Sequence, residues 1–482
     1  MLIDKHMKDS VFSAVIWGIL ERFSTQIISF LIGIILARLL SPHDYGVVGI
    51  ITIFIAFSNV FIDAGFSNAI IRKLNCTESD YSTAFFSNIA IGFLVYSILW
   101  LSAPIIAFIF KEKILETLIK IAGLNVIFNS LCIVQNAILT SKLNIRLQTL
   151  INIGGQLPAG LIAIILAYHG FGIYALVIQT IGASFIKTVL LWTFAGWRPL
   201  SKFSRDSFTY LWNFGSRLLF ANLIGVIFNE INSILIGKFI SKDALGYYSK
   251  ASQLNTNVSG VSTGVVQKIA LPLLSKYQND IPTLRLKFRE MMSLLLMVLA
   301  PITAFLCFSS KDLICVLWTS RWIESADIFS LLILGSIFSP ISSLSLTLLQ
   351  VVGKSSTILK LEAPKKAIYI ILIFCGFYYG VIGLAISSVF INFVAAVVNM
   401  FPTKSIISYS YKDQFSDLAR YVLFAFPLGY SLHILTSIQN IYLSIISYAF
   451  LFFSSYILLL FLFGDQNFKK QVKHIQKFVG ND

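Results

Sequence analysis

The sequence contains few charged residues. Only 12% of its 482 residues are Asp, Glu, Lys or Arg, whereas 57% are apolar. Soluble domains are about one quarter charged, so this chain has too little charge to cover an ordinary water-exposed surface. Apolar runs of about 20 residues, long enough to cross a hydrocarbon core, recur along the whole chain. The composition therefore predicts an all-α integral membrane protein that crosses the bilayer many times.

Several chemical signatures are also missing. The five cysteines form no CxxC pair and no Cys/His cluster, so we expect neither a metal site nor a disulfide framework. No phosphate-binding loop of the nucleotide-binding type is present, which argues against direct use of ATP. No extended loop carries the paired carboxylates that a polysaccharide polymerase or glycosyltransferase would need. These absences argue against a metalloprotein, an ATP-driven protein and a sugar-transferring enzyme, and we expect neither a cofactor nor an enzymatic activity.

The basic residues indicate how the chain lies in the membrane. The formal net charge is +15, but the lysines and arginines sit in short loops between apolar runs and not on one aromatic-rich face. This distribution excludes nucleic-acid binding and favours contact with anionic lipid. If the N-terminus is cytoplasmic, 25 of the 37 basic residues fall on the cytoplasmic side and 7 on the other. That bias predicts fourteen spans, with both termini in the cytoplasm.

The apolar runs and the breaks between them set the predicted organisation. The fourteen spans are expected at about 11–40, 45–71, 81–110, 114–140, 146–168, 170–195, 207–240, 244–272, 286–309, 326–352, 356–379, 380–402, 415–436 and 440–463. We expect a first lobe at 1–195, a cytoplasmic linker at 196–206, a second lobe at 207–402, two extra helices within 403–463 and a basic tail at 464–482. The tail segment 468–479 has an apolar face, which predicts either a helix on the anionic leaflet or a plain solubilising tail.

An internal repeat supports two lobes. The segment LARLLSPHDYG (36–46) recurs as IGKFISKDALG (236–246), which pairs Arg38 with Lys238 and Gly46 with Gly246. An offset of two hundred residues, with six predicted helices in each half, indicates a parallel repeat about an axis along the membrane normal. We therefore expect two pseudo-symmetric six-helix lobes followed by two C-terminal helices. The substrate should bind between the lobes, near the middle of the bilayer.

Three segments carry a family resemblance: ILARLLSPHDYGVVGI (35–50), DAGFSNAIIRK (63–73) and IGKFISKDALGYYSKA (236–251). In these segments the chain resembles the polysaccharide-transport family of the multidrug/oligosaccharidyl-lipid/polysaccharide (MOP) exporter superfamily, and in particular its Wzx/WzxC-like flippases. The resemblance implies a bacterial inner-membrane protein that flips undecaprenyl-diphosphate-linked oligosaccharide from the cytoplasmic to the outer leaflet by alternating access. It implies a role in O-antigen, capsule or exopolysaccharide assembly, with membrane lipids and polymerase or assembly proteins as partners.

Polar and small side chains recur on one face of two predicted helices. They are Arg22, Gln26, Ser29 and Gly33 on the first helix and Asn222, Gly225, Asn229 and Asn232 on the seventh. Spacings of three and four residues place such a set on one helical face. Amides and small residues either line a polar cavity or hold membrane helices together. Hydroxyls of a sugar headgroup cost roughly 2–7 kcal/mol each when buried without a hydrogen bond, so a flippase needs such a polar lining.

Charged side chains at membrane depth are the stronger signal, because they are costly and usually face a cavity or a partner. We expect Arg22, Arg217 and Lys250 to contact an anionic substrate, with Lys187 as a further candidate. The resemblance implies the same role, since related flippases hold the lipid diphosphate with basic residues in the central cavity. For Lys187 and Arg217, near predicted helix ends, a structural ion pair or a side chain reaching to the interface explains the position equally well.

The acidic residues predict a possible energy source. Glu21, Asp63 and Glu230 are expected to be counter-ions or sites for a coupling proton or sodium ion. The membrane potential alone favours export of an anion by about 2.3 kcal/mol per charge per 100 mV. A cation-coupled multidrug antiporter is the alternative function. The predicted buried bases match or outnumber the buried acids, which favours the flippase.

Overall fold

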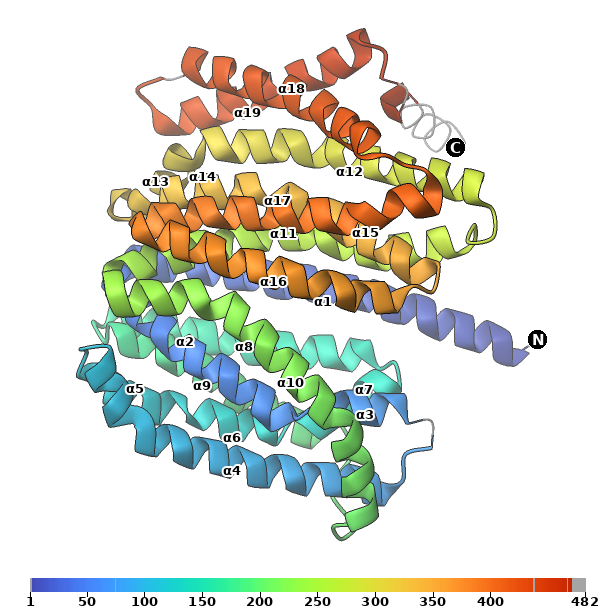
Figure 1. The fold of residues 1–482 in the computed structure, drawn as a ribbon. Coiled ribbons are helices and arrows are strands. Elements are labelled where there is room, and N and C mark those ends of the chain that lie inside the picture. Colours follow the sequence, from blue (N-terminus) through green and yellow to red (C-terminus); the bar gives the residue numbers. More distant parts are fainter. Residues whose placement is uncertain (1, 74, 437, 466, 470–482) are drawn as a thin grey trace. The chain divides into compact units, whose positions relative to one another are not determined.

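A computed structural model describes residues 2–73, 75–436, 438–465 and 467–469 (Figure 1). Within these ranges the regular structure is entirely helical. Each of the fourteen predicted segments coincides with a helix or with a broken helix. The predicted tail helix at 468–479 lies outside the described residues beyond position 469.

Packing divides the chain into two units, Met1–Ser249 and Lys250–Asp482. The first contains α1 (Leu2–Leu39), α2 (Pro42–Asp63), α3 (Phe66–Arg72), α4 (Glu78–Ile109), α5 (Ile114–Ala122), α6 (Leu124–Ser130), α7 (Ile133–Ser141), α8 (Ile145–Tyr168), α9 (Ile173–Phe194), α10 (Arg205–Leu235), a π-helix (Ile236–Ile240) and the start of α11 (Lys242–Ser275). Successive long helices run in opposite directions (Figure 1). Helix α8 packs between α1 and α9, and α10 packs on α2, α3 and α4.

The second unit contains the rest of α11 and the helices that follow it. These are α12 (Ile281–Phe308), α13 (Ser310–Trp318), a short 3-10 helix (Ser320–Trp322), α14 (Glu324–Ser336), α15 (Phe338–Val351), α16 (Ser355–Tyr378), α17 (Gly380–Ile407), α18 (Tyr411–Leu435) and α19 (Ile441–Leu462). Its core is built by α12, α15, α17, α18 and α19 around buried side chains such as Phe288, Leu296 and Phe452. This division by packing does not test the lobe boundaries expected from the sequence, which stay a prediction.

Twelve helical stretches of the described chain are long and apolar enough to span a membrane. The predicted all-helical, multi-pass membrane fold is therefore confirmed. Helices α11 and α16 are also long but are not among these twelve, and α16 carries four charged residues in its first half. These two helices make the difference between twelve spans and the expected fourteen, and that count remains a prediction.

Local sequence explains where the helices begin. Helix α2 starts with a capping box: the backbone N–H of Asp44 donates to Ser41 Oγ (3.2 Å), and the backbone N–H of Ser41 donates to Asp44 Oδ2 (2.9 Å). Pro42 occupies the first turn, where it costs no hydrogen bond. The same box starts α4 at Thr77 and α18 at Ser410. The conspicuous SPHD and TESD segments are thus helix-start signals.

The structure divides three of the predicted spans. The segment 114–140 is not one helix but three, α5, α6 and α7, while 326–352 is divided into α14 and α15 and 45–71 into α2 and α3. At the first break, the ring of Tyr96 packs so closely on Gly123 that a Cβ there would lie 2.9 Å from it. The Tyr96 hydroxyl also donates to the carbonyl oxygen of Lys120 (3.3 Å). A side chain from another helix therefore interrupts this span, and an apolar run cannot reveal that.

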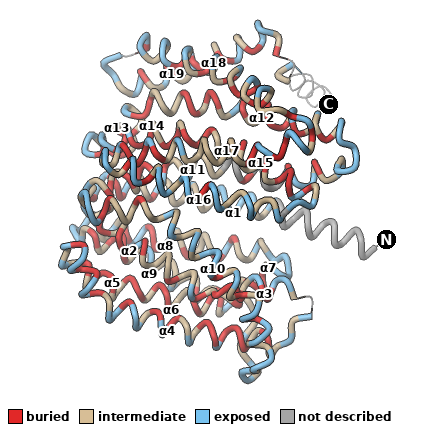
Figure 2. Tube along the Cα trace, viewed as in Figure 1, coloured by how far each residue is buried: buried red, intermediate tan, exposed pale blue. Residues whose placement is uncertain are grey.

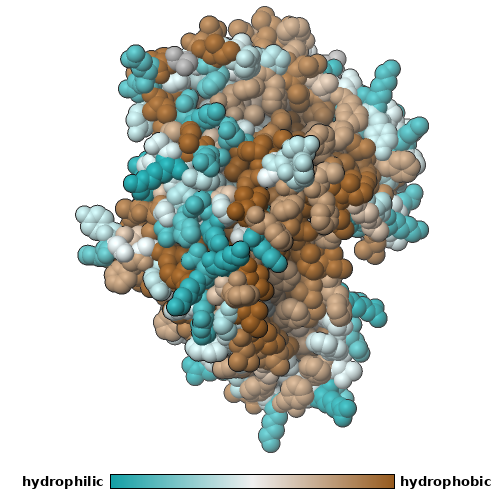
Figure 3. Space-filling model, turned by 60° about the vertical axis from the view of Figure 1, so that its left-hand side comes forward, coloured by the Kyte–Doolittle hydropathy of each residue, from teal (hydrophilic) through white to brown (hydrophobic). Residues whose placement is uncertain are grey.

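Large apolar side chains cover the outer helix faces. Along α1, Phe23, Ile27, Leu31 and Ile35 recur every four residues, and Ile27 is 55% exposed. Figure 2 shows such exposed residues alternating with buried ones along many helices, and apolar side chains dominate the face visible in Figure 3. Exposed apolar surface on this scale suits contact with lipid rather than with water.

Candidate functional site

The two copies of the sequence repeat meet in space. A Cβ on Gly46 of α2 would lie 1.8 Å from the carbonyl oxygen of Lys242, and a Cβ on Gly246 of α11 would lie 1.9 Å from that of Pro42. Positions 42 and 242, like 46 and 246, are equivalent in the repeat, so one contact is made twice and reciprocally. Only glycine permits so close an approach of two backbones.

The starts of α2 and α11 are alike in a second respect. Ser241 Oγ accepts the backbone N–H of Ala244 (3.0 Å), as Ser41 Oγ accepts that of Asp44 on α2. Beside the crossing, His43 Nδ1 lies 3.4 Å from Asp243 Oδ1 and His43 Nε2 lies 3.7 Å from Glu112 Oε2. The imidazole therefore bridges the starts of both helices and the loop after α4. The repeat is structural as well as sequential at this end of the first unit.

The predicted site residues of α1 divide between two roles. Glu21 Oε1 accepts a hydrogen bond from Asn152 Nδ2 of α8 (2.6 Å), which ties the two helices together. Arg22 is exposed and Gln26 is half-buried, and both lie on the helical face that Ser29 and Gly33 continue. This polar face is distinct from the exposed apolar face of α1. The structure thus keeps Arg22 and Gln26 together and turns Glu21 to α8.

Helix α10 carries the next group of predicted residues. Asn222, Asn229 and Arg217 are exposed, and Glu230 is half-buried. Asn232, by contrast, is buried and donates to the hydroxyl of Tyr248 on α11 (3.0 Å). The amides expected on one face therefore include one that holds two helices together.

Asp63 and Lys187 each lie about one helical turn from an end of a hydrogen-bonded polar network in the first unit. Asp63 Oδ1 accepts the backbone N–H of Ser67 (3.1 Å) and so caps α3, which accounts for the DAGFS motif locally. Lys187 of α9 is half-buried where Gly155 of α8 approaches it. In this network, Asn129 Nδ2 donates to Asn59 Oδ1 (3.0 Å) and to Asn125 Oδ1 (2.6 Å). Asn125 Nδ2 in turn donates to Ser184 Oγ (2.9 Å). Sequence reasoning missed this network of hydrogen bonds, because isolated amides in apolar helices carry no distinctive pattern.

Lys250 is the most deeply buried of the predicted bases. The residue is only 3% exposed, and its Nζ lies 4.8 Å from the ring centroid of Trp318 on α13. Nζ also donates to Gln253 Oε1 at 3.4 Å. A cation over an indole face is stabilised electrostatically, and more strongly when water is excluded. One turn further along α11, Gln253 and Thr256 are exposed, so a polar face continues from the lysine.

A second buried lysine was not anticipated. Lys365 is 3% exposed, and its Nζ donates to Glu362 Oε1 (2.5 Å) and to Asn399 Oδ1 of α17 (3.0 Å). Asn399 Nδ2 in turn donates to Ser342 Oγ of α15 (2.6 Å). Lys365 is one of the 25 basic residues expected on the cytoplasmic side. It lies about ten residues, roughly 15 Å, inside α16, and its spacing from Glu362 was the available clue.

Comparison with known proteins identifies the family. Residues 35–327, more than half of the chain, match the family model described as polysaccharide biosynthesis protein. The chain belongs to this family. Among its relatives are the teichuronic acid biosynthesis protein TuaB of Bacillus subtilis (26% identity, covering 57% of this chain and 58% of TuaB) and the lipopolysaccharide biosynthesis protein WzxC of Escherichia coli (20% identity, covering 80% and 79%). The chain thus matches less than two thirds of TuaB.

Solved structures show the same fold. The lipid II flippase MurJ, in an inward closed conformation, superposes with a TM-score of 0.76 at 17% identity, covering 93% of this chain and 98% of MurJ. An inward-facing multidrug MATE transporter of the MOP superfamily superposes with a TM-score of 0.61 at 14% identity, covering 81% and 98%. Such low identities establish the fold alone. The family match confirms the expected resemblance to polysaccharide biosynthesis proteins, and the chain shares the fold of MurJ and of this MOP-superfamily transporter.

Proposed function

We propose that this protein flips oligosaccharide repeat units linked to undecaprenyl diphosphate from the cytoplasmic to the outer leaflet. Membership of a polysaccharide biosynthesis family supports a role in O-antigen, capsule or exopolysaccharide assembly. The fold shared with a lipid II flippase is compatible with a lipid-linked substrate. In this proposal the protein is a transporter of the bacterial inner membrane, with no cofactor and no catalytic step, and a polymerase or other assembly protein receives its product.

The observation that carries the proposal is the buried ammonium of Lys250 on the polar helix α11. An ionised group at membrane depth is costly and usually serves a pathway or a ligand. A diphosphate would gain from such a cation in surroundings that exclude water. Arg22, Arg217 and Lys187 are the further bases that we assign to the diphosphate, and Gln26, Asn222 and Asn229 are assigned to sugar hydroxyls.

The proposed architecture has fourteen spans in two six-helix lobes and two extra helices, with both termini cytoplasmic. The reciprocal contact of Gly46 with Lys242 and of Gly246 with Pro42 supports a local two-fold relation between the repeats. We propose that this contact closes the outer end of the substrate path and opens during alternating access. The loops that flank it, by the predicted topology, face away from the cytoplasm.

The proposed energy source is the membrane potential, which favours outward movement of a doubly charged anion by roughly 4–5 kcal/mol at 100 mV. Coupling to protons or sodium through Glu21, Asp63 or Glu230 is a separate proposal. The hydrogen bonds of Glu21 with Asn152 and of Asp63 with Ser67 give both carboxylates a structural role as well. Replacing each of the three acids by its amide, one at a time, tests coupling at zero membrane potential.

Lipid mass spectrometry on a strain that lacks the gene tests the function. We expect an undecaprenyl-diphosphate oligosaccharide to accumulate in the cytoplasmic leaflet, and its mass would identify the sugars. Complementation with Lys250→Gln should fail to clear this lipid, whereas Lys250→Arg, which keeps the charge, should clear part of it. Intact surface polysaccharide together with new sensitivity to cationic drugs would instead support the multidrug antiporter.

A further inference from the structure

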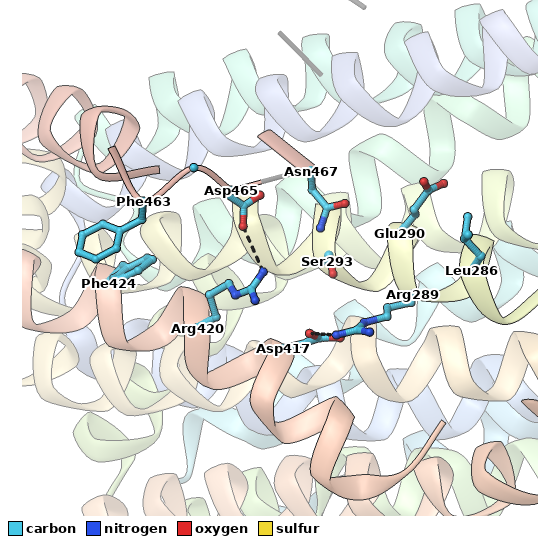
Figure 4. A pocket seen from close by; sticks show the side chains of 11 residues that line it. Leu286, Arg289, Glu290, Ser293, Asp417, Arg420, Phe424, Phe463, Asp465 and Asn467 are labelled. Atoms are coloured by element: carbon cyan, nitrogen blue, oxygen red, sulfur yellow. Dashed lines mark hydrogen bonds and ion pairs between the residues drawn. The ribbon is translucent and has the colours of Figure 1, made fainter. Parts of the chain in front are cut away.

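A polar cavity of about 540 Å³ lies in the second unit, at the end where α12 and α18 begin and α19 finishes. Figure 4 shows two arginine–aspartate pairs across its middle and the rings of Phe424 and Phe463 together at one side. The pairs are Arg289 with Asp417 and Arg420 with Asp465. The predicted topology puts this end of the helices at the cytoplasmic face of the membrane.

Each pair consists of a buried acid and a half-exposed base. The side chains of Asp417 and Asp465 are only 4% and 3% exposed, whereas those of Arg289 and Arg420 are 49% and 50% exposed. Asp417 accepts two hydrogen bonds from Arg289, at 2.7 and 2.9 Å, and one from the Tyr409 hydroxyl at 2.6 Å. The acids are therefore covered by partners, and the bases are what the cavity presents.

Asp465 is covered in a similar way. It accepts hydrogen bonds from Arg420 (3.5 Å), from the hydroxyl of Tyr421 (3.3 Å) and from the backbone N–H of Phe468 (2.9 Å). Burial of these acids beneath the guanidinium groups fixes both arginines in place. A guanidinium has five N–H donors, so each pair leaves further donors at the cavity wall.

Other groups at the cavity strengthen its preference for an anion. Asn467 and Ser293 add an amide and a hydroxyl to the wall. Lys469 Nζ lies 3.2 Å from where a Cβ on Gly464 would stand, which places a third cation at the rim. The remaining acid of the lining, Glu290, pairs with Lys287 at 3.0 Å. The cations of the cavity thus lie at its surface, and the acids are paired.

We propose that this cavity binds the phosphate of an anionic glycerophospholipid from the cytoplasmic leaflet. Two arginines at one wall suit a phosphate, because the planar guanidinium can bond two oxygens at once. The rings of Phe424 and Phe463, together at one side of the cavity, suit the first methylene groups of an acyl chain and not a soluble ion. Basic pockets between membrane helices at the cytoplasmic side are a recurring mode of anionic lipid recognition. The lipid would be a resident ligand, separate from the transported substrate.

The test uses the full-length protein in detergent, with phosphatidylglycerol, phosphatidylcholine or glycerol phosphate added. Native mass spectrometry counts the retained lipids, and thermal unfolding reports stabilisation. The cavity variant combines Arg420→Gln with Asp465→Asn, so that no buried carboxylate is left alone. The matched control combines Lys311→Gln with Asp327→Asn, an exposed pair elsewhere in the same unit. Lys469→Gln is a second cavity variant that leaves both buried acids untouched.

We expect retention of phosphatidylglycerol to fall about tenfold or more in the double cavity variant, as loss of charged hydrogen bonds predicts. Lys469→Gln should show a smaller fall, and the control should retain lipid as the original protein does. Equal retention in all proteins would overturn the proposal. Phosphatidylcholine retained as strongly as phosphatidylglycerol would also overturn it, and so would full competition by glycerol phosphate. The readout is binding alone, so it does not depend on the proposed transport function.

Discussion

Replacing Gly246 by alanine would test whether the crossing of α2 and α11 holds the protein in the conformation described above. The added methyl group would lie 1.9 Å from the carbonyl oxygen of Pro42 and 2.7 Å from its carbonyl carbon. Ordinary contacts of a Cβ lie at 3.4 Å or more. Both obstructing atoms belong to the backbone, so no change of rotamer can relieve the clash. The two helices would have to separate by about 1.5 Å.

Overpacking of this kind costs typically about 1–3 kcal/mol. If alternating access separates the two helices at this crossing, the added methyl group does not destabilise the open state. A penalty of about 2 kcal/mol would then move the equilibrium between the states about 30-fold toward the open one. Gly46→Ala should act alike, because its methyl group would lie 1.8 Å from the carbonyl oxygen of Lys242. The double variant should add little more, since one separation relieves both clashes.

Disulfide formation provides the assay. A cysteine pair at positions 43 and 243, where His43 and Asp243 are in contact, should cross-link quickly when the native cysteines are removed. Gly246→Ala should slow this cross-linking, by up to about 30-fold where the open state becomes the predominant one. Gly49→Ala is the matched control, because a Cβ there would meet only side-chain atoms of Ser249 and Leu245, at 3.1–3.3 Å. If Gly246→Ala cross-links as fast as Gly49→Ala, the crossing does not control the conformation.

Three further predictions concern stability and reactivity. Glu362→Gln should destabilise the protein by about 1–3 kcal/mol, measured by thermal unfolding. This loss is smaller than for a fully buried pair, because the Glu362 side chain is 40% exposed. Adding Lys365→Met, which removes the buried charge, should restore part of the lost stability. Burial and the nearby Asp80 carboxylate raise the pKa of the Cys76 thiol. In a variant whose other cysteines are replaced, maleimide should therefore label Cys76 more slowly than free cysteine at pH 8, and the rate should increase with pH. Equal labelling rates would contradict this. Hydrogen bonds from Thr283 lower the pKa of Asp280, so Asp280→Ala should lower the unfolding midpoint at pH 7, and this difference should shrink steadily as the pH falls below the usual carboxyl pKa of about 3.9 toward the lowered value; a difference that does not change with pH would refute the ionised cap.

The sequence was sufficient for features that depend on local chemistry. The serine of SPHDYG, with its aspartate three residues later, predicts the start of α2, and the repeat at 236–246 predicts an equivalent start for α11. The apolar runs locate every long helix, because the bilayer requires their length. The repeat also indicated which segments are equivalent, although only the structure shows that Gly46 and Gly246 meet in reciprocal contacts.

Features that depend on contacts between distant segments could not be predicted. The break at Gly123 is caused by Tyr96 of a neighbouring helix, and the burial of Lys365 depends on Asn399, thirty-four residues away. Asp63 was assigned to a coupling or counter-ion role from its depth alone, and its bond to the Ser67 amide emerges only when α3 is known to begin there. Polar residues in apolar helices reveal that they have a partner but not which one.

The π-helix at Ile236–Ile240 has a consequence for the two repeats. Helix α1 has no such turn before Ser41, whereas the equivalent stretch before Ser241 contains one. A π-turn inserts one residue, which rotates everything upstream by about 100° relative to a regular helix. Arg22 and Asn222, two hundred residues apart, therefore point in different directions with respect to their own helix ends. Under the proposed function, this phase difference makes the two repeats chemically unequal, because equivalent positions of α1 and α10 would turn unlike groups toward the substrate.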